Sequence, residues 1–183
     1  MLHQIKQYVQ LSPAAEQALR EVIMEEAGKK GDLLLREGMV CRKIWFLTEG
    51  FARVYYRLGD REVTDWIEMK NGFVLSIPSF FNQSASHKSI ELITDCRLNS
   101  ITHQDLELLF KQFHEIERFG RLISNYALTM MSQKVEDLVF KTAHQRYRKL
   151  MDERPEILLN VPLNFVASLL GMSQETLSRM RAI

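Results

Sequence analysis

Residues 163–183 read LNFVASLLGMSQETLSRMRAI and have the pattern of two short helices joined by a tight turn. Such a pair needs a small residue where the helices cross and a glycine where the backbone turns with positive φ. Ala167 and Gly171 occupy those two places, and Ser173 can cap the second helix. The apolar residues then fall on inward faces, at Val166, Leu170, Leu177 and Met180. The stretch therefore predicts a helix-turn-helix.

The outward face of the second helix carries side chains that can read bases. With Leu177 and Met180 inward, helical spacing turns four others outward: Gln174, Glu175, Ser178 and Arg179. In the major groove, glutamine can bond to adenine, glutamate to the amino group of cytosine and arginine to guanine. The alternative for Glu175 and Arg179 is a solvated ion pair one helical turn apart.

Further polar residues are predicted to contact DNA phosphates, which position a protein without carrying sequence information. On the final helix these are Thr176 and Arg181, and the capping residue Ser173 is also counted among the predicted DNA-binding residues. On the preceding helical segment they are Arg146, Arg148 and Lys149, for which an ordinary solvated face is the alternative. Residues 141–183 hold seven Lys or Arg against four Asp or Glu, while residues 1–140 hold 17 against 19, so positive charge gathers at this end.

The composition is that of a folded globular protein. Apolar residues make up 46% of the 183, and Gly (8) and Pro (4) are scarce. The two cysteines and five histidines show no ligand spacing, so the sequence predicts no metal, haem or iron-sulfur site. No nucleophile paired with a base stands out, which argues against an enzyme. Without a signal peptide or an apolar run of about 20 residues, we expect a cytoplasmic protein with no membrane segment.

The first half of the chain has the pattern of a β-rich domain. A helical run, PAAEQALREVIMEEA, begins at Pro13, and the periodicity changes after Gly31. Six short runs rich in β-branched and aromatic residues then follow, separated by turn signals: DLLLREG, KIWFLTEG, FARVYYRLGD, REVTDWIEM, SIELITD and CRLNSIT. This spacing predicts an antiparallel roll or sandwich.

A long helix is predicted after the strands. Thr102 can cap a helix with Asp105 three residues later, and residues 116–140 contain no proline. Residues 116–140 carry an apolar stripe at Phe119, Ile123, Tyr126, Met130 and again at Phe140. A helix of about 25 residues spans nearly 40 Å, too long for one small sheet to cover. We therefore expect a homodimer through residues 116–140, the alternative being a helix packed wholly inside one subunit.

The helix over residues 142–152 is expected to end at Pro155. After it, LLNVP, residues 158–162, has the pattern of a short strand. Because the printed sequence stops at Ile183, any wing beside the helix-turn-helix is expected to rest on this strand alone.

Taken together, the β-rich module, the long helix and VPLNFVASLLGMSQETLSRMR resemble the Crp-Fnr family of bacterial transcription regulators, over about residues 30–183. The resemblance implies an α+β fold. A cyclic-nucleotide-binding-like antiparallel β-roll, of the double-stranded β-helix or jelly-roll type, would form the sensor domain over residues 1–110. A dimerisation helix over 111–140 and a partial winged helix-turn-helix over 141–183 would follow. Gln174, Glu175 and Arg179 match the three base-reading positions of the family, with Gln174 in place of a commoner arginine.

The ligand site departs from the pattern of the family members that bind cyclic nucleotide. They use Gly-Glu-Leu, whose Glu holds the ribose hydroxyl, and Arg-Ser or Arg-Thr, whose Arg neutralises the phosphate. Here residues 75–77 are Leu-Ser-Ile, and Lys88-Ser89 stands for Arg-Ser. Loss of the glutamate removes a bond worth about 1.5–3 kcal/mol, and lysine lacks the bidentate fork of arginine. Pro78 also removes a backbone N–H from the turn.

The sequence therefore predicts no cAMP or cGMP cofactor, and it leaves another small effector open. An anion could be met by Ser76, His87, Lys88 and Ser89. Alternatively, Phe80 and Phe81 fill the pocket, or His87 and Lys88 lie in a solvent-facing loop.

The functional prediction is a homodimeric transcription regulator that binds double-stranded DNA at a palindromic site. The alternative is a small-molecule-sensing or protein-interaction module whose helix-turn-helix is vestigial. The low charge of the final helix favours that alternative.

Overall fold

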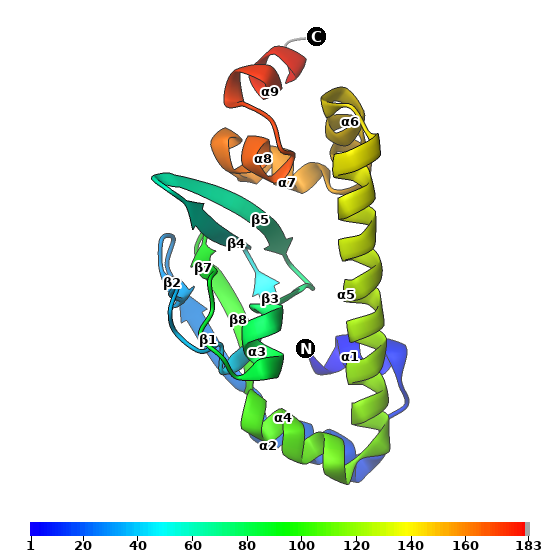
Figure 1. Cartoon of the computed structure of the whole chain (residues 1–183). Coiled ribbons are helices and arrows are strands. Elements are labelled where there is room, and N and C mark those ends of the chain that lie inside the picture. The colour runs from blue at the N-terminus through cyan, green and yellow to red at the C-terminus, as the bar shows by residue number, and fades with distance from the viewer. Residues whose placement is uncertain (182–183) are drawn as a thin grey trace.

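The structure is a computed structural model and describes residues 1–181. A β-roll, one long helix beside it and a small helical domain at one end follow each other along the chain (Figure 1). This is the predicted α+β architecture. The strands are β1 (Met24–Gly28), β2 (Leu33–Leu35), β3 (Lys43–Glu49), β4 (Phe51–Leu58), β5 (Arg61–Met69), β6 (Phe73–Val74), β7 (Ser89–Leu92) and β8 (Cys96–Thr102).

Two four-stranded sheets make the roll, in the orders β1-β8-β3-β6 and β2-β7-β4-β5. All the pairings are antiparallel. The alternating apolar residues of both sheets meet in one core, which includes Leu47, Ile90, Leu92 and Leu98. Each of the six predicted runs contains a strand, because alternation and turn residues agree there.

One sequence prediction about the N-terminal region was wrong. The helix that begins at Pro13 ends at Val22, as α2 (Pro13–Val22), and MEEAG forms β1. The residues of β1 pair with β8 from Met24↔Ser100 to Gly28↔Cys96, and this pairing overrides their helical propensity. Two short helices, α1 (Leu2–Tyr8) and α3 (Ile77–Asn82), were not predicted.

The remaining helices follow the roll. They are α4 (His103–Gln112), α5 (His114–Phe140), α6 (Ala143–Glu153), α7 (Pro155–Asn160), α8 (Leu163–Leu169) and α9 (Gln174–Arg181). The hydroxyl of Thr102 caps α4 by accepting from the Asp105 N–H, as predicted. The predicted strand at LLNVP was wrong: Pro155 begins α7, where its fixed φ favours a helix start, so no strand supports a wing within residues 1–181.

Within those described residues, the structure contains no helix with both the length and the apolar character that crossing a membrane requires. They also contain no group of three His, Cys, Asp or Glu side chains placed to hold a metal ion.

The connection between β3 and β4 requires glycine. Gly50 has φ +91°, and a Cβ there would lie 2.5 Å from the Cys96 sulfur and 2.6 Å from the Asp95 carbonyl oxygen. Gly59, between β4 and β5, also has positive φ, +62°, but a Cβ there would meet nothing within 4 Å. The two positions share a backbone conformation and differ in packing.

We expect Gly59→Ala to lower the free energy of unfolding by about 1–2 kcal/mol, the cost of a left-handed residue. Gly50→Ala should lower it by about 1–3 kcal/mol more, because the methyl group must displace backbone and sulfur atoms. Urea unfolding followed by circular dichroism measures both. Equal losses for the two variants would contradict this account of the β3–β4 turn.

Candidate nucleic-acid interface

The helix-turn-helix forms as the sequence predicted. Gly171, with φ +64°, turns the chain between α8 and α9. The Ser173 hydroxyl caps α9 by accepting from the Thr176 N–H at 3.2 Å. The inward residues Val166, Ala167, Leu170 and Leu177 are buried, and Met180 is half-buried against them.

The predicted base-reading side chains lie on the free face of α9. Gln174, Glu175, Ser178 and Arg179 are exposed, as is Arg181, while Thr176 is half-buried. This helix lies at the end of the molecule far from α2 and α4 (Figure 1). Hydrogen bonds from the backbone N–H of Glu175 and from Ser173, with the charge of Arg179, hold the pKa of the Glu175 carboxyl below its ordinary value. Glu175 is therefore a hydrogen-bond acceptor at neutral pH.

Two of the three basic residues predicted on α6 make internal contacts. Arg146 donates to the carbonyl oxygens of Lys141 at 2.6 Å and of Leu170 at 2.8 Å, so it ties the end of α5 to the turn of the helix-turn-helix. Lys149 donates to Asp137 on α5. Arg148 is exposed. The described structure thus gives Arg146 and Lys149 structural contacts and leaves Arg148 open to solvent.

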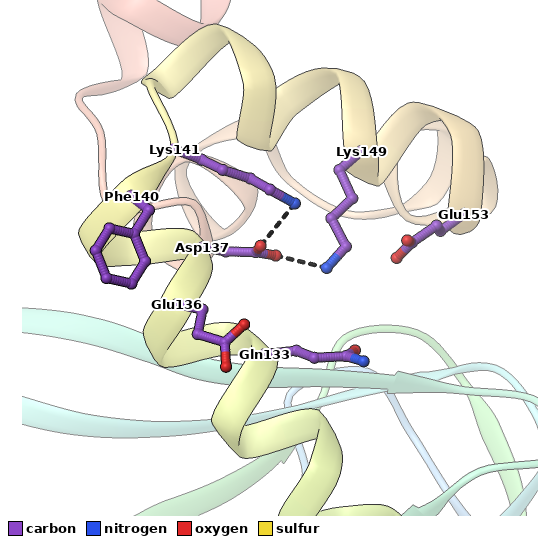
Figure 2. A pocket seen from close by; sticks show the side chains of 7 residues that line it. All are labelled: Gln133, Glu136, Asp137, Phe140, Lys141, Lys149 and Glu153. Carbon is purple, nitrogen blue, oxygen red and sulfur yellow. Dashed lines mark hydrogen bonds and ion pairs between the residues drawn. The ribbon is translucent and has the colours of Figure 1, made fainter.

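The joint between α5 and α6 is a cluster of charges around Asp137 (Figure 2). The Asp137 carboxylate lies 2.7 Å from Lys141 and 2.6 Å from Lys149. Burial opposes ionisation of Asp137, but hydrogen bonds from Lys141 and Lys149 outweigh it and hold the pKa of the carboxyl below its ordinary value. A shallow depression lies over this joint, lined by Gln133, Glu136, Asp137, Phe140, Lys141, Lys149 and Glu153.

The helical domain is docked on the β4–β5 hairpin of the roll. Ile67 and Ile93 of the roll share one apolar core with buried residues of α6–α9, among them Tyr147, Ile157 and Leu177. Polar contacts surround this core. The Ser168 hydroxyl on α8 accepts from the Thr64 N–H at 2.9 Å, and Arg154 lies 3.0 Å from Glu68. Burial raises the pKa of Glu68 above its ordinary value despite the nearby charge of Arg154.

Arg53 is the most buried charge at this docking surface, with 3% of its surface exposed. It lies 2.5 Å from Glu62 and 2.6 Å from Glu91, and its guanidinium stacks 3.6 Å from the centre of the Phe165 ring. Sequence reasoning missed Arg53 and Ser168, because neither belongs to a local motif. Arg53 contacts Glu91 and Phe165, and Ser168 contacts Thr64, all of them distant in the chain.

The four residues predicted to meet an effector are held mainly by the roll itself. Ser76 is buried, with its hydroxyl 2.8 Å from that of Ser86, and Ser86 in turn bonds both the N–H and the carbonyl of Lys88. The Ser89 hydroxyl accepts from the Glu37 N–H at 3.0 Å. His87 is exposed, as expected for a solvent-facing loop.

Phe80 and Phe81, the two aromatic residues considered as pocket fillers, differ in burial. Phe80 is buried in the core of the roll, whereas Phe81 is 52% exposed. Neither of the two surface depressions described is lined by Ser76, His87, Lys88 or Ser89: one covers the α5–α6 joint, and the other lies near Gly28 and Arg97.

Lys88 is bound by an acid that the sequence analysis missed. Its amino group lies 2.6 Å from the carboxylate of Asp65, which also lies 2.8 Å from Lys134 on α5. Asp65 falls in the middle of β5, between Thr64 and Trp66. The adjacent polar pair Thr64-Asp65 interrupts the alternation of the strand and was the one local signal.

Comparison with known proteins agrees with this architecture. The family model of the cyclic nucleotide-binding domain matches residues 25–113. FixK2 from Bradyrhizobium japonicum is similar in structure, with a TM-score of 0.78 at 18% identity over 88% of this chain and 83% of that one. A Crp/Fnr-family transcriptional regulator from Eubacterium rectale gives 0.72 at 19% identity, over 93% and 82% of the two chains.

The catabolite activator protein of Thermus thermophilus is similar over 98% of this chain and 85% of its own, with a TM-score of 0.61 at 16% identity. A search of curated proteins gives no match. Residues 25–113 thus match the cyclic nucleotide-binding domain family, and residues 1–181 have the fold of the Crp-Fnr transcription regulators, which confirms the resemblance seen in the sequence.

Proposed function

We propose that this protein is a homodimeric transcription regulator that reads a palindromic DNA site with α9. The observation that carries the proposal is the exposed polar face of α9, on a helix-turn-helix whose inner apolar face is buried. Gln174, Glu175, Ser178 and Arg179 project from that face, and Leu177 anchors the helix from below. The major groove is wide enough to admit an α-helix, so polar side chains on one exposed helix face can reach the base edges. The shared fold with transcription regulators supports the same function.

Phosphate contacts would come from the rim of α9 and from α6. Ser173, Thr176 and Arg181 are the candidates on α9, and exposed Arg148 is the candidate on α6. Arg146 and Lys149 are better explained as the residues that fix α6 against the turn and against α5. This small number of phosphate contacts implies a moderate electrostatic contribution to affinity.

A second copy of the chain is the proposed partner of α5. Its outer face carries apolar side chains at spacings of three and four: Leu128, Met131, Val135 and Leu138, with exposed fractions of 70%, 47%, 60% and 44%. Lys134 and Asp137 point the other way, into contacts with Asp65 and with α6. A 3-4 spacing on a free helix face is what a two-helix seam needs. Two copies around a two-fold axis would bury the same face in each subunit.

The stripe that the sequence analysis chose for this dimer differs from the exposed one. Phe119 is buried against α1, where its ring lies 5.9 Å from that of Tyr8, and Ile123 and Met130 are half-buried. Of that stripe, Tyr126 and Phe140 are exposed. Apolar residues occur on more than one side of α5, so the sequence alone did not decide which stripe the subunit itself covers.

A second candidate function is a sensing or protein-interaction module with a vestigial helix-turn-helix. The internal contacts of Arg146 and Lys149 favour it, because they reduce the basic surface available for DNA. A selection from random DNA duplexes separates the two candidates. Enrichment of a sequence supports the regulator, and its absence supports the module.

Arg179→Ala should weaken binding to the selected palindrome by at least about tenfold and relax specificity at one base step, because the bidentate contact to guanine is lost. Arg36→Ala, a change at an exposed arginine of the roll, is the matched control and should leave affinity unchanged. Fluorescence anisotropy at several salt concentrations measures both, and affinity should fall as the salt concentration rises, because each phosphate contact releases counterions. Equal affinity for all duplexes would contradict the proposal.

Val135→Glu should raise the dimer dissociation constant at least about 100-fold, because a charge would be buried without a partner in the α5 seam. Gln133→Glu adds the same charge to an exposed position off the apolar stripe and should leave the dimer intact. Sedimentation equilibrium measures the three dissociation constants. A wild-type chain that stays monomeric at micromolar concentration, or equal effects of the two variants, would rule out the seam.

A further inference from the structure

Three charged side chains from distant parts of the chain, Asp65, Lys88 and Lys134, form one cluster. The carboxylate bonds to Lys88, just before β7, at 2.6 Å and to Lys134, in the second half of α5, at 2.8 Å. Lys134 also donates to the backbone carbonyl of Asp65 at 2.5 Å. All three side chains are mostly buried, with exposed fractions of 25% for Asp65, 15% for Lys88 and 26% for Lys134. They are therefore shielded more from water than an ordinary surface ion pair.

A β-bulge places Asp65 there. In the β4–β5 ladder, Val54 pairs with Trp66 and Tyr55 pairs with Thr64, so Asp65 is the extra residue. A bulge leaves the extra residue without a ladder partner and changes the direction of its side chain. This is why both the carbonyl and the carboxylate of Asp65 can reach Lys134. The preceding residue, Thr64, donates its N–H to Ser168 on α8.

At the bulge, therefore, adjacent residues of the roll form polar bonds to both α5 and α8 of the helix-turn-helix. The Asp65 carboxylate accepts from Lys134 of α5, and the Thr64 N–H donates to Ser168 of α8. Lys88, just before β7, donates to the same Asp65 carboxylate. An anion at Lys88 was one alternative that the sequence left open, and in the structure the anion beside Lys88 is the carboxylate of Asp65. Burial opposes ionisation of Asp65, but bonds to Lys134 and Lys88 outweigh it and hold the pKa of its carboxyl below the ordinary value.

We propose that Asp65 is a built-in counter-ion that takes the place of an anionic effector, so that the roll, α5 and α8 are held together at the β5 bulge with no small molecule bound. Two lysines share one carboxylate, so removal of that carboxylate leaves two like charges facing each other. The consequence for DNA binding rests on the proposed function, whereas the structural coupling does not. Added anions should therefore not stabilise the wild-type protein further, because the Asp65 carboxylate already pairs with both lysines.

The direct test is chemical rescue of Asp65→Ala in the full chain, followed by thermal unfolding. The variant should lose at least about 5 °C in Tm, because two mostly buried lysines lose their partner. Sodium formate should restore part of that loss, while sodium chloride at the same ionic strength should not. Asp60→Ala, at the exposed turn of the same hairpin, is the matched control and should match the wild type in both salts.

A second variant tests the link to α5 and does not depend on Asp65→Ala folding. Lys134→Met leaves the Asp65–Lys88 pair in place and removes the bond to α5. It should lower Tm by less than Asp65→Ala does, make α5 more sensitive to protease, and show no response to formate. A Lys134→Met protein as stable and as protease-resistant as the wild type would overturn the link.

DNA binding is then measured separately on the same proteins. The wild type should bind its palindrome without an effector, and cAMP, cGMP or inorganic phosphate at constant ionic strength should not raise its affinity. Asp65→Ala should bind more weakly, with partial recovery in formate. A rise in wild-type affinity with any of these anions, or Asp65→Ala as stable as Asp60→Ala, would overturn the inference. Formate rescue of Tm without any DNA binding would support the counter-ion and count against the proposed function alone.

Discussion

The bulge in β5 is the constraint on which the arrangement of this molecule depends. One extra residue in the β4–β5 ladder turns Asp65 toward Lys134 on α5 and directs the Thr64 N–H to Ser168 on α8. Beside it, the buried Arg53 stacks on Phe165, and Ile67 enters the core of the helical domain. The polar bonds at the bulge orient α5 and α8 relative to the roll. The apolar core around them gives most of the stabilisation, because apolar burial contributes more to folding than the net gain from hydrogen bonds.

This docking relates the two surfaces that the proposed function needs. The exposed apolar stripe of α5 would set the two-fold axis, and the exposed face of α9 would enter the groove. Polar bonds hold the joint between these surfaces: Asp137 bonds to Lys141 and Lys149, and Arg146 donates to the carbonyl oxygen of Leu170. The geometry of this joint matters because two recognition helices must match successive major grooves about 34 Å apart. In the sequence, Lys141 and Lys149 are charged residues with no evident partner. In the structure, their ion pairs with Asp137 fix the position of α6 relative to α5.

Much of the fold was predictable from local patterns, and the exceptions share one cause. Alternation and turn residues located the six predicted strands, and Ala167, Gly171 and Ser173 located the helix-turn-helix. MEEAG was assigned to a helix because only its pairing with β8 makes it a strand. The stripe of α5 predicted from the sequence includes Phe119, which α1 covers in the structure, a contact that the sequence did not reveal. Asp65 was missed because the partner that defines its role, Lys134, lies 69 residues away. Long-range contacts decided each of these cases.

An effector-free dimer that reads DNA through α9 should select its own site from a random duplex library when the purified protein is used for the selection. The library is sequenced after several rounds at moderate salt with no small molecule added. We expect one enriched palindrome whose half-sites are centred about 10–10.5 base pairs apart, or a multiple of that spacing. Enrichment of no sequence, or of a sequence without two-fold symmetry, would contradict it.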